Sequence, residues 1–217
     1  MSKNLRIGLI ALALGVLVAA GLAATFLTER VGPQAANDGD AARQAALASV
    51  HAPTIGEPGA KVHIVEFLDP ACETCALFYP MVKGWMAEVP GEIRLSIRHL
   101  AFHEGADIAV KVLEASRKQD KYWETLEALL KSQRQWTQHH TVLPERILPA
   151  VSGVGLDLDQ LRADMDSFEV LTRIEQDKKD AILLRVTKTP GYFVNGRELQ
   201  AFGRQQLANL VREELEK

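Results

Sequence analysis

The chain has 217 residues, which is enough for one folded domain with appended segments. Hydrophobic residues make up 47% and charged residues 24%, and this composition is typical of a folded protein. The formal net charge of −3 argues against nucleic acid as the main partner, because proteins that bind nucleic acids usually present a basic face.

The N-terminal segment from Ile7 to Thr28 contains no charged side chain. As a helix it would be about 33 Å long, enough to cross the hydrocarbon core of a bilayer. Lys3 and Arg6 precede it, and the positive-inside rule then places the following chain outside the cytoplasm. We expect residues 1–28 to be a membrane anchor, with a transmembrane helix from Ile7 to Thr28. A cleaved signal peptide, with a site at Gly21-Leu22-Ala23, is the alternative, and both place the domain in an oxidising compartment.

Residues 29–59 have a different composition, dominated by Ala, Gly, Asp, Gln and Pro. No strand pattern is visible there, and a short helix from Ala41 to Val50 is the one element that we consider. We expect this stretch to be a linker that holds the domain away from the membrane.

A strand, a helix and a second strand begin the folded part. Val62 to Leu68 is an apolar run that predicts a buried strand, and Ala76 to Glu88 has helical spacing, with Pro80 expected to kink the helix. Ile93, Leu95 and Ile97 alternate with polar residues and predict another strand. This order predicts a βαβ unit with a parallel strand pair.

The middle of the chain is predicted to be helical, and the C-terminal part to contain a hairpin and a last helix. The expected helices are residues 105–118, 121–133, 144–151, 157–166, 169–184 and 204–216. Asn195-Gly196 is a strong two-residue hairpin signal, so we expect strands at Tyr192 to Val194 and at Glu198 to Ala201.

The only two cysteines, Cys72 and Cys75, are separated by two residues and lie between the first strand and the helix after it. At a helix N-terminus the backbone N–H groups and the helix dipole stabilise a thiolate, which is the form that attacks disulfides. The pattern therefore predicts a redox-active pair. A structural disulfide would close too small a loop to stabilise much, and a zinc site would lack its other ligands, so we expect no metal.

Three stretches together resemble the thioredoxin-fold oxidoreductases, and within them the DsbA-like group. They are Val65-Glu66-Phe67 through Cys72 and Cys75 to Phe78-Tyr79-Pro80, then Ile97-Arg98-His99 with Ala101-Phe102-His103, and finally Val186 through Thr189-Pro190 to Val194-Asn195-Gly196. The resemblance covers roughly residues 60–217. It implies an α/β thioredoxin fold with a helical domain inserted at about 104–168, here preceded by the expected N-terminal transmembrane helix.

Each site residue has an expected role. Cys72, at the helix start, should attack the substrate, and Cys75, one turn further in, should resolve the mixed disulfide. The resemblance implies that Glu66 is a buried acid that handles protons for the inner cysteine; the alternative is a Glu66 that faces solvent. It also implies that Thr189-Pro190 has a cis peptide bond, faces the disulfide and binds the substrate.

We expect a thiol–disulfide oxidoreductase without a bound cofactor, at the inner membrane of a bacterium and facing the periplasm. Its partners would be unfolded or partly folded proteins that contain cysteines, together with a membrane-bound redox partner such as a quinone-linked oxidase. Glu73-Thr74 replaces the Pro-His pair that is typical of DsbA. A carboxylate next to Cys72 disfavours its thiolate, so this departure favours a milder oxidant, an isomerase or a reductase over a strong oxidant. An oxidant remains the first expectation, and a reductase or isomerase is the second. A non-enzymatic periplasmic chaperone or a soft-metal-binding protein is the rival from another class.

Overall fold

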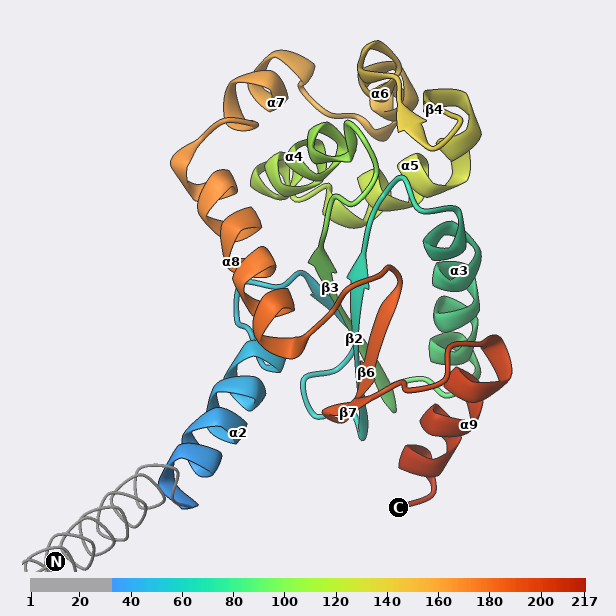
Figure 1. Ribbon diagram of the computed structural model, residues 1–217. Coiled ribbons are helices and arrows are strands. Elements are labelled where there is room, and N and C mark those ends of the chain that lie inside the picture. The colour runs from blue at the N-terminus through green and yellow to red at the C-terminus, as the bar shows by residue number, and fades with distance from the viewer. Residues whose placement is uncertain (1–32) are drawn as a thin grey trace, which may run out of the picture. The chain divides into compact units, whose positions relative to one another are not determined.

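The computed structural model describes residues 33–217 (Figure 1). The expected anchor, Ile7 to Thr28, lies outside the described residues. Within residues 33–217, no helix is both long and apolar enough to cross a membrane. Residues from Ala46 to Lys217 form one compact unit.

A five-stranded mixed sheet lies at the centre of this unit, in the order β1-β3-β2-β6-β7. The strands are β1 (Thr54–Ile55), β2 (Val62–Leu68), β3 (Ile93–His99), β6 (Gly191–Val194) and β7 (Arg197–Glu198). β2 and β3 run parallel, which confirms the predicted βαβ unit, and the other neighbouring pairs are antiparallel. β2 and β3 are buried along most of their length because helices cover both faces of the sheet.

Helices account for most of the remaining chain. They are α2 (Pro33–Leu47), α3 (Glu73–Glu88), α4 (Ala106–Ser116), α5 (Tyr122–Trp136), α6 (Pro144–Val151), α7 (Leu158–Asp164), α8 (Phe168–Leu184) and α9 (Arg204–Leu215). The predicted run of helices between β3 and β6 is confirmed, although its boundaries shift by a few residues. A small hairpin of β4 (Thr137–Gln138) and β5 (Thr141–Val142), which the sequence analysis did not predict, separates α5 from α6.

The two faces of the sheet have separate cores. α3 and α9 pack on one face and α8 on the other (Figure 1). Side chains alternate along β2, so Ile64 belongs to the core with α3 and α9, whereas Val65 and Phe67 belong to the core with α8. By the same alternation Glu66 faces α3, the helix that carries the cysteines.

The segment before β2 is more structured than the sequence predicted. The expectation that residues 29–59 contain no strand is wrong, because Thr54 and Ile55 pair with β3 as an antiparallel edge strand. The Thr54 hydroxyl also hydrogen-bonds with the Ser96 hydroxyl at 2.6 Å. Two residues are too few to show an alternating pattern, so only the pairing partner reveals this strand.

The hairpin at Asn195-Gly196 is confirmed. Both residues have positive φ angles, 47° and 81°, as a two-residue turn between antiparallel strands requires. The Asn195 side chain accepts a hydrogen bond from the His63 amide at 2.8 Å and donates one to the Lys61 carbonyl at 3.1 Å. The second strand is shorter than expected, since β7 ends at Glu198.

Candidate active site

Cys72 is the N-cap residue of α3, and Cys75 lies one turn inside the helix. Both are free thiols. The Cys72 residue keeps 6% of its surface exposed, whereas Cys75 has none. Cys72 is therefore the more exposed of the two cysteines.

The surroundings of Cys72 favour its thiolate. A hydrogen bond from the Cys75 side chain is the largest cause, and together with the backbone N–H of Cys75 and the Thr189 side chain it outweighs the opposing effect of burial. These interactions lower the pKa of Cys72 from 9.0 to about 6. The Thr74 backbone N–H adds to the effect, because unpaired N–H groups at a helix start point toward the N-cap side chain.

The surroundings of Cys75 favour its thiol. Burial is the main cause that raises the pKa of Cys75 well above 9.0, and the negative charges of Glu66 and Cys72 add to it. The two sulfurs thus differ in protonation at neutral pH, where Cys72 is mostly a thiolate and Cys75 keeps its proton.

Glu66 is a carboxyl group on a buried strand, with no exposed surface. Burial raises the pKa of Glu66 from 4.5 to about 8, and the Cys72 thiolate contributes, while Tyr192 acts in the opposite direction. Tyr192 is directly across the β2–β6 pair, yet neither its hydroxyl nor the carboxyl oxygens of Glu66 complete a well-aligned hydrogen bond within the described residues. Because Glu66 has no exposed surface, the alternative that it faces solvent is wrong.

The peptide bond between Thr189 and Pro190 is cis, as the resemblance implied. The thiol of Cys72 donates a hydrogen bond to the Thr189 carbonyl oxygen at 3.5 Å. The loop before β6 thus lies against the cysteine pair, and the structure brings Cys72, Cys75, Glu66 and Thr189 together, with Pro190 next along the chain.

Asp69 is a buried residue that the sequence analysis missed. Its side chain accepts four hydrogen bonds, from the amides of Ala71, Phe102 and His103 and from the Nδ1 of the His103 ring, at 2.8 to 2.9 Å. Its carbonyl accepts the Cys72 amide at 3.0 Å. Asp69 therefore ties the turn before Cys72 to the loop after β3. The sequence signal was a carboxylate directly after an apolar strand.

A family model described as "Thioredoxin" matches residues 48–213. The chain belongs to the thioredoxin family. It is a DsbA-like member, 24% identical over 186 residues to the thiol:disulfide interchange protein DsbA of Bordetella parapertussis, a match that covers 84% of this chain and 83% of the relative.

Other relatives of this thioredoxin-family chain differ in length. The Na(+)/H(+) antiporter NhaA of Herminiimonas arsenicoxydans is 30% identical over 145 residues, which cover 67% of this chain but only 22% of the antiporter. The chain therefore matches about a fifth of that relative. Among solved structures, a thioredoxin-like oxidoreductase from Silicibacter pomeroyi DSS-3 is 29% identical, with a TM-score of 0.69, covering 81% of this chain and 98% of that one.

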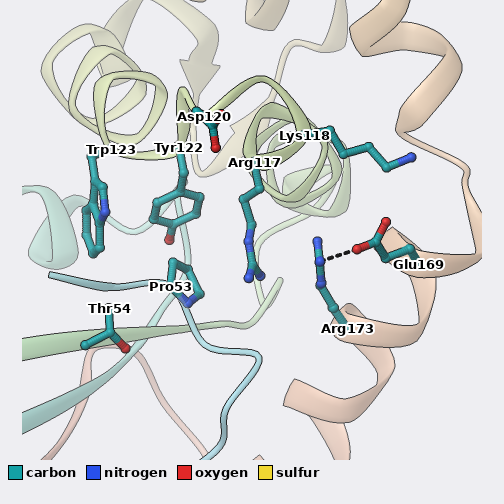
Figure 2. Close-up of a pocket in the computed structure, with 9 residues that line it drawn as sticks. All are labelled: Pro53, Thr54, Arg117, Lys118, Asp120, Tyr122, Trp123, Glu169 and Arg173. Carbon is teal, nitrogen blue, oxygen red and sulfur yellow. Dashed lines mark hydrogen bonds and ion pairs between the residues drawn. The ribbon is translucent and has the colours of Figure 1, made fainter. Parts of the chain in front are cut away.

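A separate pocket of about 440 Å³ lies between β1, the start of α5 and α8 (Figure 2). Its basic side chains are already matched by carboxylates: Arg117 pairs with Glu114 at 2.8 Å and Arg173 pairs with Glu169. It shares no lining residue with the cysteine site of this thioredoxin-family chain, and we assign it no role. Among residues 33–217, no group of three or more His, Cys, Asp or Glu side chains is placed to hold a metal ion.

Proposed function

We propose that the chain oxidises pairs of cysteines in unfolded or partly folded proteins outside the cytoplasm. The observation that carries this proposal is the contrast between the two sulfurs. Cys72 is a stable thiolate at the helix N-terminus, with a pKa of about 6, and Cys75 is a buried thiol with a raised pKa. A sulfur that is stable as a thiolate is a good leaving group, and this favours passing the disulfide on to a substrate.

The reaction would proceed in two exchanges. A substrate thiolate attacks the Sγ of Cys72 in the oxidised pair, the Cys72–Cys75 bond breaks, and Cys75 leaves as a thiolate that takes up a proton. A second substrate thiolate then attacks the substrate sulfur of the mixed disulfide, and Cys72 leaves as a thiolate. The substrate gains a disulfide and loses two electrons, which the protein pair receives.

Glu66 would supply the proton that Cys75 takes up. With a pKa near 8, it is mostly protonated at neutral pH, and by the alternation of side chains along β2 it faces α3, the helix that carries Cys75. When the pair is oxidised again, the same carboxylate would accept the proton from Cys75. Glu66 therefore serves as a proton relay and has no contact with the substrate.

The protein pair must be reoxidised after each cycle. We propose a membrane-bound redox partner for that step, reached because residues 1–28 anchor the chain in a bacterial inner membrane with the domain in the periplasm. N-terminal sequencing of the protein isolated from cells tests the anchor. A start at or just after Ala24 would mean a cleaved signal peptide and would remove the anchoring proposal.

A disulfide reductase is the second candidate, and Glu73 is the observation that favours it. Glu73 is exposed and directly follows Cys72. An anion beside Cys72 disfavours its thiolate and so disfavours the reduced form, which makes the pair less oxidising.

Parallel assays with reduced, unfolded ribonuclease and with insulin test both functions. The oxidised wild-type chain should form ribonuclease disulfides, and Cys72→Ser should abolish this activity. An oxidised chain that forms no substrate disulfides, while its reduced form cleaves insulin disulfides efficiently, would favour the reductase.

A further inference from the structure

A groove of about 440 Å³ runs beside Cys72, between the first turns of α3 and the last turns of α5. Glu73, Ala76 and Leu77 line one side, and residues 130–135 line the other. Since Glu73 directly follows Cys72, a substrate segment held in this groove lies next to the attacking sulfur. Figure 1 shows α3 and α5 meeting at this end of the molecule.

Two basic side chains in the groove have no carboxylate partner. Lys131 and Arg134 are exposed, and no ion pair joins either to a carboxylate within residues 33–217. Other basic side chains of the unit are matched, such as Lys111 with Asp166 and Lys118 with Asp164. Among the described residues that line the groove, Glu73 is the one acidic residue. The lining of the groove therefore carries a net positive charge, in a chain whose net charge is −3.

The loop on the other side of the cysteine site is also basic. Lys188 directly precedes Thr189, is exposed, and has its Nζ 6.0 Å from the ring centre of Phe202. Within the described residues, Lys188 likewise forms no ion pair. Leu77 and Phe202 add apolar surface, with 57% and 39% of their areas exposed. Positive charge and apolar surface thus lie on both sides of Cys72.

We propose that this surface selects extended substrate segments with acidic residues beside the cysteine. The proposal deepens the proposed function and rests on it. An aspartate or glutamate next to the substrate cysteine would pair with Lys131 or Arg134 in the groove, and an apolar neighbour would contact Leu77. The complementary charges would raise the rate of encounter and favour this orientation.

The test compares three reduced peptides with the same pair of cysteines, each cysteine flanked on both sides by Asp, by Asn or by Lys. The oxidised full-length chain forms the disulfide in each peptide, and each rate is divided by the rate with the uncharged oxidant 2-hydroxyethyl disulfide, which removes differences in intrinsic thiol reactivity. The Asp peptide should react about threefold to tenfold faster than the Lys peptide at low salt, with the Asn peptide between them. High salt should reduce this difference.

Charge reversal then locates the effect. The double variant Lys131→Glu with Arg134→Glu should reverse the order of the peptides. The matched control, Lys178→Glu with Lys179→Glu, changes the net charge equally on exposed positions of α8, across the sheet, and should keep the wild-type order. Equal normalised rates for the three peptides, or an unchanged order in the groove variant, would overturn the inference while the proposed function stands. No oxidation of any peptide would overturn both.

Discussion

Cys72 and Cys75 are three positions apart in one helical turn, yet their environments favour opposite protonation states. Cys72 lies at the N-cap, where the N–H groups of the first turn and the Cys75 thiol stabilise a negative charge. Cys75 lies inside the helix against the sheet, where burial and the charge of Glu66 destabilise a thiolate. The difference in reactivity therefore depends on where α3 begins.

The rate of Cys72 alkylation should report its pKa directly. Iodoacetamide reacts with the thiolate, so the rate in the reduced protein should rise with pH and level off above a midpoint near 6. Below the midpoint it should fall about tenfold per pH unit, because the thiolate fraction falls by that factor. Mass spectrometry identifies the modified cysteine. A midpoint near 9, or first alkylation at Cys75, would contradict the assignment.

Glu66→Gln should stabilise the reduced protein at pH 7 while slowing disulfide exchange. The raised pKa of Glu66 means that, between about pH 4.5 and 8, the folded state keeps a proton that the unfolded state has lost. Folding stability therefore falls as pH rises through this window, by up to about 3 kcal/mol at pH 7. Glutamine does not ionise, so the variant does not lose folding stability in this way as the pH rises.

Urea unfolding of the reduced wild type and variant at pH 5 and pH 7 measures the effect. The gain should be larger at pH 7 than at pH 5. A variant that is destabilised equally at both values would show that Glu66 is not held protonated by its surroundings.

Asp69→Asn should destabilise the turn before Cys72. The carboxylate uses both oxygens to accept four hydrogen bonds, and an asparagine offers one oxygen and places an NH₂ group against an amide donor. We expect a loss of about 2–4 kcal/mol in the free energy of unfolding. His103→Ala removes only one of the four hydrogen bonds and should cost less. Equal losses for the two variants would argue against Asp69 as the anchor of this turn.

At the scale of elements, α8 is joined to the sheet by a buried cluster of charges. Arg98 of β3 has no exposed surface and donates hydrogen bonds to Asp177 at 2.5 Å, to the Ala46 carbonyl at 2.6 Å and to Asp180. Burial alone would raise the pKa of Asp177, but a hydrogen bond with His51 and the charge of Arg98 hold it below its usual value. The cluster connects β3, α8 and the segment before β1.

Arg98→Met should therefore cost about 3–5 kcal/mol of unfolding free energy, because it leaves two buried carboxylates without their cation. Adding Asp177→Asn and Asp180→Asn should recover part of the loss. The control Arg197→Met removes an arginine whose side chain is 47% exposed and that pairs with Glu213 and Glu214, and it should cost about 1 kcal/mol or less. Urea unfolding measures all three, and similar losses for Arg98→Met and Arg197→Met would contradict this role of the cluster.

Periodicity and turn chemistry were sufficient to predict most elements. The parallel β2–β3 pair, the helices between β3 and β6, and the Asn195-Gly196 hairpin follow from local patterns. β1, β4 and β5 do not, because each has only two residues and depends on its pairing partner.

The sequence likewise predicts only the part of the site that depends on local spacing. The spacing of Cys72 and Cys75 marks a redox pair, but the burial of Glu66, its opposition to Tyr192 and the four hydrogen bonds of Asp69 arise only when distant segments meet. The charge cluster around Arg98 was missed for this reason too, since its members are about 80 residues apart.

At the scale of the whole molecule, the reactive end of the unit joins three segments that are far apart in the sequence. The turn from β2 into α3 carries the cysteines, and the loop before β6 brings Thr189 to Cys72. Asp69 joins the loop after β3 to the turn that carries the cysteines. The thioredoxin-family sheet holds these segments in place, and α5 packs against α3, the helix that carries the cysteines.

Trapping of mixed disulfides tests the central claim most directly. A peptide disulfide is added to the reduced full-length chain and to its Cys75→Ser and Cys72→Ser variants, and the products are identified by intact mass after acid quenching. Cys75→Ser should accumulate a stable adduct on Cys72, the wild type should turn over to the Cys72–Cys75 disulfide, and Cys72→Ser should form no adduct. An adduct on Cys75 in the Cys72→Ser variant at a comparable rate, or none on Cys72 in Cys75→Ser, would contradict Cys72 as the attacking sulfur.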